Sequence, residues 1–430
     1  MNGYEQPVAA DPLHRARREA EVRALLTGLE AELADWKQAA RERGPLEKHQ
    51  SQIESAVRVV TGALDRLKAL PAPERHAKAP ELVLDLHHLW DFFRTKLAVR
   101  HIPRCRRILD VADELAWAVY DPVRQAAADR LALREPPLTF PSRHPVPFAT
   151  ARGSDFEELL PSGRQRTLAG RRATRHLPFP VIGIPWSAGH HLPSLLAVAH
   201  ETGHHIEDDF GLAEPLRTRL RERAGLPADR VAVWEQWLGE VFADVCGALA
   251  CGAAYLWTLA DALAADPDAD GGLRDYPPPR LRLLVCRSAL AGPGTSTLPL
   301  LPGTAGPDDV EAPAVVRALV GDAFEELGGA TLASLVGLRR PAELEEARLR
   351  LCAGLRSGRS DVPGVLAAAT LAFVGDPDEY DRKSLGERAL REVLSLVPQE
   401  RRAASAAEQV LAARDHATGS DLFDLLTTSR

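Results

Sequence analysis

The chain has 430 residues, 26% of them charged, and a formal net charge of −7. This length exceeds what one ordinary hydrophobic core holds, so we expect two or three packed units. The acidic balance argues against nucleic acid and anionic membrane surfaces as partners. We find no secretory signal pattern and no run near the ~20 apolar residues of a membrane span. The five cysteines form no CxxC pair, so we expect reduced thiols in the cytoplasm.

The amino-terminal part of the chain is predicted to be helical. After the pair Asp11 and Pro12, which favours a helix start, apolar residues recur at helical spacing. Apolar residues spaced four and three apart over 53–67 predict a second helix packed against a neighbour. The Pro-rich stretch 70–80 is expected to separate this hairpin from further helices. We therefore expect a helical N-terminal domain over residues 1–135.

The middle of the chain contains one of its few β-like runs. Residues 181–184, Val-Ile-Gly-Ile between prolines, predict a short strand. An edge strand at this place can hold an extended peptide, and a buried strand of a small sheet is the alternative. We expect a core domain over residues 136–290 and a helical C-terminal domain over residues 291–430, after a Gly- and Pro-rich stretch. The predicted fold class is mainly α, and α+β at most.

The stretch "HETGH" carries the strongest chemical signal. His200 and His204 are four apart, so on a helix they project from one face and reach the same ion at ~2 Å each. Glu201 lies beside them and can act as a base on a metal-bound water. Apolar residues on the opposite side predict that this helix has one face in a core and one in a cleft. His205 points away from the ligand face, and we expect it to be solvated or to lie behind the ligands.

A third ligand is needed because a catalytic zinc site takes three protein ligands and keeps one position open. Glu240 and Asp244, also four apart on a predicted helix, are the best candidates. Ala243 and Gly247 lie on the same side of that helix and are small. Together with Gly203 on the first helix, they favour a close approach of the two helices.

"HETGH" followed by "ExxxD" resembles the thermolysin-like zinc metallopeptidases, the gluzincins. The resemblance covers about residues 176–285 and is specific at the metal motifs. It implies a zincin-like core that binds one Zn²⁺, with three ligands, a general base, and a carboxylate that accepts a hydrogen bond from a ligand imidazole. In this sequence these are His200, His204 and Glu240 as ligands, Glu201 as the base and Asp244 as the carboxylate.

An oxyanion that develops on a peptide carbonyl needs a hydrogen-bond donor besides the metal. Tyr276, on a Pro-stiffened loop, is our candidate, and a tyrosine that only packs in the turn is the alternative. Tyr255 lies fifteen residues after Glu240, which is ~22 Å along a continuous helix and excludes it unless the helix breaks. We expect Arg280 and Arg282 to form surface pairs, with substrate binding as the alternative.

These patterns predict a zinc-dependent metallopeptidase that acts on a peptide or protein substrate. A catalytically inactive, zinc-stabilised helical scaffold or partner-binding protein is the alternative, and a metal hydrolase with a non-peptide substrate is a third class. Glu201 discriminates between the first two, because a structural zinc site needs no free carboxylate and tends to close with a fourth ligand. The flanking helical regions offer surfaces for a protein partner, and the sequence does not choose among these uses.

Overall fold

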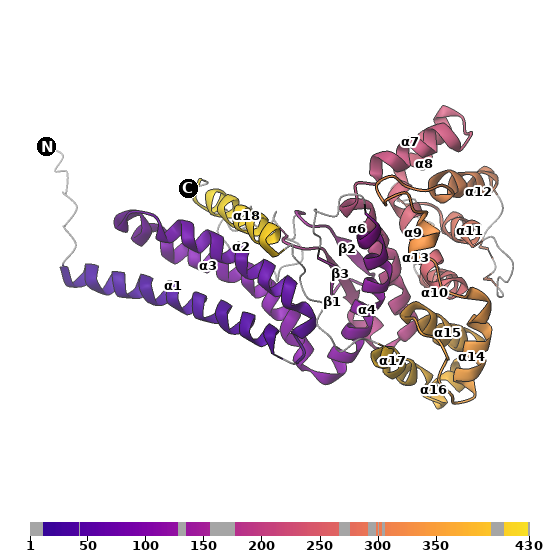
Figure 1. The fold of residues 1–430 in the computed structure, drawn as a ribbon, viewed down its shortest axis with the longest axis horizontal. Helices are drawn as coiled ribbons and strands as arrows, with labels where there is room; N and C mark the ends of the chain where they lie inside the picture. Colours follow the sequence, from indigo (N-terminus) through magenta and orange to yellow (C-terminus); the bar gives the residue numbers. More distant parts are fainter. Residues whose placement is uncertain are drawn as a thin grey trace. The chain divides into compact units, whose positions relative to one another are not determined.

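Helices dominate the structure of the chain (Figure 1), which confirms the prediction of a mainly α fold with minor β content. The computed structural model describes residues 12–42, 44–127, 135–154, 177–265, 276–290, 298–299, 301–302, 306–396 and 408–428. The chain divides into two compact units. The first comprises Met1–Ala98, Gly153–Pro178 and Arg401–Arg430, and the second comprises Val99–Arg152 and Phe179–Glu400.

The first unit contains a bundle of helices from both ends of the chain. Its helices are α1 (Pro12–Arg41), α2 (Gln50–Lys68), α3 (Ala72–Ala98) and α18 (Glu408–Thr428), with a short 3₁₀ turn, η1 (Glu47–His49), before α2. The apolar positions recur at helical spacing and are buried, as on α1 and α2 at Val22, Leu26, Leu29, Leu33, Ile53, Val57, Val60 and Leu64. The two amino-terminal helices therefore form as their periodicity predicts.

Only the first residues of the Pro-rich stretch 70–80 separate helices, because α2 ends at Lys68 and α3 already begins at Ala72. Pro73 lies in the first turn, where its missing N–H costs no helical hydrogen bond. Pro80 lies inside the helix and removes one such bond. The buried apolar residues that follow it, including Leu82 and Leu86, supply the packing that keeps the helix continuous.

Helix α18, from the far end of the sequence, packs closely against α2. Two glycines permit this contact, because a Cβ on Gly419 would lie 2.4 Å from the carbonyl oxygen of Val59, and one on Gly62 would lie 3.1 Å from that of His416. The last helix thus belongs to the same unit as the first three. This differs from the expected C-terminal domain of residues 291–430.

The second unit holds the remaining elements around one continuous hydrophobic core. Its helices are α4 (Pro103–Ala126), α6 (Ala197–Asp209), α7 (Ala213–Arg223), α8 (Ala228–Gln236), α9 (Leu238–Cys251), α10 (Ala253–Ala265), α11 (Pro279–Ala289), α12 (Pro307–Val320), α13 (Leu332–Val336), α14 (Leu344–Cys352), α15 (Val362–Gly375), α16 (Pro377–Arg382) and α17 (Leu385–Leu396). Short 3₁₀ turns join some of them, namely η2 (Val99–His101), η4 (Trp186–His190), η5 (Leu192–Leu196) and η6 (Pro341–Glu343).

The division into two units differs from the expected boundaries at residues 135 and 290. Helix α15 gives the physical reason, because its residues from 364 to 372 are all buried and it must be enclosed on every side. It packs against α4, α9, α10, α14 and α17. Segments expected in three domains therefore share one core.

The described strands form a three-stranded sheet in the order β1-β3-β2. Strand β3 (Val181–Pro185) is central, parallel to β1 (Leu138–Ser142) and antiparallel to β2 (Phe148–Thr150). The expectation that 181–184 form an edge strand is therefore wrong, because both sides of β3 are paired and all its residues are buried. The outer positions belong to β1 and β2.

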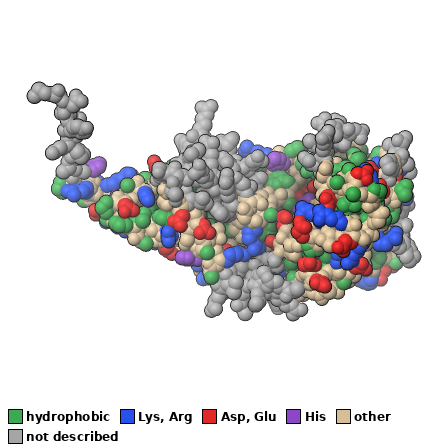
Figure 2. Space-filling view, turned by 90° about the horizontal axis from the view of Figure 1, so that it is seen from above, with side chains coloured by type: hydrophobic (Ala, Val, Ile, Leu, Met, Phe, Trp, Pro, Cys, Tyr) green, Lys and Arg blue, Asp and Glu red, His purple; other side chains and the backbone are tan. Residues whose placement is uncertain are grey.

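Charges of both signs are interspersed over the described residues on the face shown in Figure 2, in keeping with the small net charge. None of the described helices is both long enough and apolar enough to cross a membrane. The face shown in Figure 2 has no large patch of charges of one sign among the described residues. The candidate site instead lies at the contact between α6 and α9.

Candidate metal centre

Helix α6 places the "HETGH" residues with one face in the core. Val198, Ala199 and Ile206 are buried on the apolar side, as its periodicity predicts. Thr202 is also buried, and its hydroxyl donates to the carbonyl of Val198 at 2.7 Å, so this polar side chain is satisfied within the helix. The opposite side of α6 faces α9.

Small residues allow α6 and α9 to approach closely. A Cβ on Gly203 would lie 2.8 Å from Cα of Ala243 and 3.0 Å from Cβ of Cys246. Any larger residue at Gly203 would therefore push the helices apart. This close contact, expected from the small residues of both helices, brings Glu240 opposite His200.

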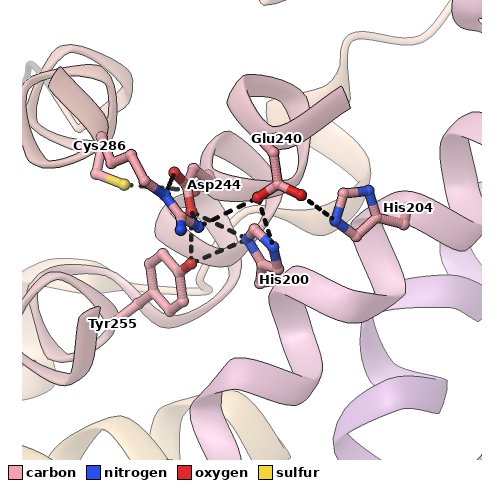
Figure 3. A network of polar contacts seen from close by, with 7 residues as sticks. His200, His204, Glu240, Asp244, Tyr255 and Cys286 are labelled. Atoms are coloured by element: carbon pink, nitrogen blue, oxygen red, sulfur yellow. Dashed lines mark hydrogen bonds and ion pairs between the residues drawn. The ribbon is translucent and has the colours of Figure 1, made fainter. Parts of the chain in front are cut away.

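The potential ligand atoms of His200, His204 and Glu240 all lie within 4.8 Å of one another (Figure 3). Nε2 of His200 is 3.5 Å from Oε2 of Glu240, and Nε2 of His204 is 3.4 Å from Oε1 of Glu240. Two donors that each bind an ion at ~2 Å in tetrahedral geometry lie about 3.3 Å apart. The three side chains therefore fit a single zinc ion, and two imidazoles with one carboxylate are a donor set that zinc prefers.

The charges of the cluster are strongly coupled. Burial by itself would lower the pKa of His200, but hydrogen bonds to Asp244 and Glu240 raise this pKa to about 10. Burial would raise the pKa of Glu240, but its contacts with His200 and His204 and the charge of Arg282 bring that pKa well below the ordinary range. Without a metal, a proton on His200 thus balances the carboxylates, and a bound cation would replace it.

Glu201 is the residue expected to act as the base. It is 7% exposed, and burial raises the pKa of its carboxyl group, while the nearby His200 and His204 lower it. A carboxyl group with a raised pKa holds a proton more readily at neutral pH than an exposed glutamate. The position on α6 and this environment suit proton transfer beside the ligand cluster.

Asp244 is fully buried behind the ligands and accepts hydrogen bonds on both oxygens. Nδ1 of His200 lies 3.0 Å from Oδ1, so the contact expected between Asp244 and a ligand imidazole is present. Arg282 on α11 contacts Oδ2 through Nε at 2.7 Å and Oδ1 through Nη2 at 2.8 Å. The prediction that Arg282 forms a surface pair is wrong, since its side chain is only 13% exposed. A buried carboxylate needs such a cation, and packing of α11 on α9 supplies it.

Tyr255 also reaches Asp244, because the helix that carries Glu240 ends before it. Gly252 has φ +61° and ends α9, and the chain turns into α10. The hydroxyl of Tyr255 is 2.8 Å from Oδ1 of Asp244 and 3.1 Å from Nδ1 of His200. The helix break, left open by the sequence, thus brings Tyr255 to the Nδ1 side of His200, on the opposite side of the ring from Nε2.

Tyr276, the expected oxyanion donor, is 50% exposed and directly follows residues 266–275, which lie outside the described residues. Its catalytic role stays a prediction.

Arg280 pairs with Asp309 at 2.7 Å, in agreement with the expected surface pairing. The sequence also offers Asp208, four residues after His204, as a candidate to support the ligands, and its side chain is exposed.

His205 is 1% exposed, so the expectation of a solvated side chain is wrong. Its Nε2 lies 3.2 Å from the carbonyl oxygen of Val181, which joins α6 to the central strand. Burial lowers the pKa of His205 to about 3, so the ring is neutral and Nε2 is the donor. His205 directly follows the candidate ligand His204 in the sequence, but it contributes to the packing of α6 on the sheet.

Comparison with known proteins yields no match to a protein-family model, a curated protein or a solved structure. The candidate site is therefore interpreted from its own geometry. The structure brings together the residues that the sequence predicts for the site, namely His200, His204, Glu240 and Asp244. It adds Arg282, for which the sequence predicted a surface ion pair.

Proposed function

We propose that this chain is a zinc-dependent peptidase in which His200, His204 and Glu240 bind one Zn²⁺. The observation that carries the proposal is the convergence of three ligand atoms within 4.8 Å beside a buried Glu201. When bound, zinc would supply Lewis acidity that polarises a carbonyl group and makes water a nucleophile at neutral pH. The "HETGH" and "ExxxD" motifs support a thermolysin-like arrangement.

Glu201 would act as the base in this reaction. Its carboxylate takes a proton from the attacking water and later delivers it to the leaving amine. Burial raises the pKa of Glu201, and a carboxylate whose pKa is raised is a stronger base, which favours the uptake of the proton from water. Asp244 would hold the imidazole of His200 in place from behind.

The number of ligands favours an enzyme over a zinc-stabilised scaffold. Within the described residues, no fourth His, Cys, Asp or Glu atom joins the cluster of His200, His204 and Glu240. A structural zinc site is usually closed by four protein ligands, whereas a catalytic site keeps one position for water or substrate. A set of three donors therefore supports the proposal of a catalytic site.

The small sheet favours a peptide over a non-peptide substrate. Strand β2 (Phe148–Thr150) is an outer strand of the sheet and lies next to α6 (Figure 1). An outer strand can bind an extended peptide through main-chain hydrogen bonds. β2 thus replaces residues 181–184 as the outer strand proposed to hold the substrate.

The proposal is tested by substituting the base and one ligand separately. We expect Glu201→Gln to retain one zinc per chain and to lose peptide hydrolysis, and His204→Ala to lose both. Zinc content is measured by elemental analysis, and hydrolysis by mass spectrometry of a proteome-derived peptide mixture. Glu207→Gln, a carboxylate-to-amide change on the same helix, is the matched control and should keep zinc and activity.

Two outcomes would contradict the proposal. Loss of zinc in Glu201→Gln would place this residue in the metal shell, and hydrolysis by His204→Ala would separate the activity from the site. The peptides cleaved by wild type and left intact by Glu201→Gln would also define the substrate. Acyl or phosphoryl hydrolysis that depends on Glu201, with peptides left intact, would replace the peptidase by a non-peptide hydrolase.

A further inference from the structure

Four hydrogen-bond donors surround the buried carboxylate of Asp244. Oδ1 accepts from Tyr255 at 2.8 Å and from Nη2 of Arg282 at 2.8 Å, and lies 3.0 Å from Nδ1 of His200. Oδ2 accepts from Nε of Arg282 at 2.7 Å. This side chain is completely inaccessible to solvent. Such a dense set of donors fixes the carboxylate in one orientation.

This arrangement determines which nitrogen of His200 carries hydrogen. A carboxylate paired with a guanidinium group is ionised and can only accept hydrogen bonds. Nδ1 of His200 must therefore donate to Asp244, and the hydroxyl of Tyr255 donates to the same oxygen. In the neutral ring, Nε2 then has the free lone pair and points toward Glu240, 3.5 Å away. When His200 gives up a proton to bind a metal, the hydrogen on Nδ1 thus stays with Asp244, and Nε2 is the nitrogen left free for the ion.

Arg282 contacts both acidic residues of the "ExxxD" motif. Besides its two bonds to Asp244, its Nη2 lies 3.4 Å from Oε2 of Glu240. The rigid guanidinium group of Arg282 therefore holds the carboxylates of Glu240 and Asp244 in a fixed arrangement relative to each other. A lysine has a single ammonium group and cannot make the contacts of Arg282 with both carboxylates in the same geometry.

We propose that Arg282 and Tyr255 are positioning residues of the zinc site, which hold Asp244 and Glu240 so that His200 offers Nε2 to the ion. The inference rests on the metal-binding half of the proposed function and not on peptide hydrolysis. Neither residue is assigned a contact with the metal or the substrate. Their effect passes through the orientation of His200 and Glu240.

The path of the chain supports this role for Tyr255. Gly252 ends α9 with φ +61°, a conformation that other residues rarely adopt, and α10 then carries Tyr255 back toward α9. The ring of Tyr255 lies against Gly247, where a Cβ would be 2.8 Å from the ring. Two glycines thus make room for a tyrosine whose hydroxyl reaches Asp244.

The test measures zinc affinity of the full chain by competition with a chromogenic chelator. Tyr255→Phe, which keeps the ring and removes the hydroxyl, should weaken zinc binding about tenfold, and Arg282→Lys should weaken it about 10–100-fold. The visible absorption spectrum of the cobalt-loaded protein should change in both variants, since it reports ligand geometry. Thermal unfolding of the metal-free proteins shows whether each variant is folded.

Two matched controls separate this role from general stability. Tyr380→Phe removes another buried hydroxyl, which has no hydrogen-bond partner among the described residues. Arg359→Lys alters another buried guanidinium, paired with Asp361. Both should leave zinc affinity and the cobalt spectrum unchanged. If Arg282→Lys is unfolded, Tyr255→Phe still decides the question.

The outcomes distinguish this inference from the proposed function. A wild-type chain that binds no zinc overturns both. Wild-type zinc binding with unchanged affinity and cobalt spectrum in Tyr255→Phe and Arg282→Lys overturns only the positioning role. An Arg282→Lys variant with unchanged zinc affinity and a raised KM for a cleaved peptide would make Arg282 a substrate-binding residue instead.

Discussion

Two helix crossings in this molecule both have glycine at the contact, but they differ in the charged groups beside it. At the crossing of α2 and α18, Gly62 faces Gly419, and the flanking Arg58 pairs with Glu54 at 3.0 Å and with Asp415 at 3.5 Å. At the crossing of α6 and α9, Gly203 faces Ala243, and the charged groups beside it are imidazoles and carboxylates.

The two crossings differ in which groups balance the charges of the acidic side chains. Around α2 and α18, cations of the chain contact the acidic groups directly. Around α6 and α9, Arg282 balances Asp244, whereas the Nε2 atoms of two histidines converge with the carboxylate of Glu240. The same close packing thus gives a structural ion pair in one place and a candidate donor set for a cation in the other.

The largest expected effect comes from removing the buried acid at each crossing. Asp244→Ala removes both short hydrogen bonds of the buried Arg282 and leaves only its 3.4 Å contact with Glu240, so we expect a loss of about 3–5 kcal/mol in the free energy of unfolding. Asp415→Ala should cost about 1 kcal/mol, because Arg58 is 20% exposed and water can solvate it. Denaturant unfolding of both variants measures the difference. Equal losses would contradict the distinction between the two crossings.

Alanine at the contact glycines should separate packing from metal binding. Gly203→Ala places a Cβ 2.8 Å from the backbone of Ala243, and Gly419→Ala places one 2.4 Å from the carbonyl oxygen of Val59. Each should destabilise the chain by about 1–3 kcal/mol through overpacking. Only Gly203→Ala should weaken zinc binding, measured by chelator competition. Equal zinc affinity in the two variants would show that the spacing of α6 and α9 does not control the site.

Zinc affinity should rise with pH because the ion replaces a proton on His200. The neighbouring carboxylates raise the pKa of this ring to about 10 in the metal-free protein, against the opposing effect of burial. Below that pH one proton must leave, so apparent affinity should increase about tenfold per pH unit and level off near pH 10. Chelator competition, corrected for the pH dependence of the chelator, measures the slope. A flat profile from pH 6 to 8 would contradict a protonated His200.

The smallest expected effect concerns His205, which lies on the sheet side of α6. Burial lowers its pKa to about 3 in the folded chain, below the usual 6.5 of an unfolded histidine. The unfolded state therefore takes up the proton first, and the stability present above pH 6.5 is lost as the pH falls toward 3.

The variant His205→Gln keeps a donor toward Val181 without a titrating ring. Between pH 6.5 and pH 5.5, we expect the free energy of unfolding of this variant to fall by about 1 kcal/mol less than that of wild type. Denaturant unfolding with a metal chelator present in both samples measures this difference. Parallel pH profiles would show that His205 does not titrate on unfolding.

Local periodicity made much of this protein predictable. The apolar spacing on α1 and α2 is enough to predict those helices, since one buried face stabilises each. The spacing of four residues places His200 with His204, and Glu240 with Asp244, because a helix turn contains 3.6 residues. Small residues at Gly203 and Ala243 indicate that the two helices pack closely. These are properties of short stretches, so a sequence pattern contains them.

Long-range partners were not predictable in this way. Arg282 reads as a surface residue on its own helix, and its burial depends on the packing of α11 against α9. Tyr255 depends on the helix break at Gly252, a single residue whose conformation changes the direction of the chain. The place of β3 between two strands, and of α18 beside α2, depends on which segments pair in space.

The sequence by itself therefore determined the helical fold class and the two helix faces that carry the candidate ligands, since both follow from spacing within single helices. Only the tertiary structure decided what surrounds them: Arg282 and Tyr255 behind Asp244, and His205 on the central strand. The physical reason is that a buried charge or hydrogen-bonding group is satisfied by whichever donor the fold brings within ~3 Å, and that donor can come from any part of the chain.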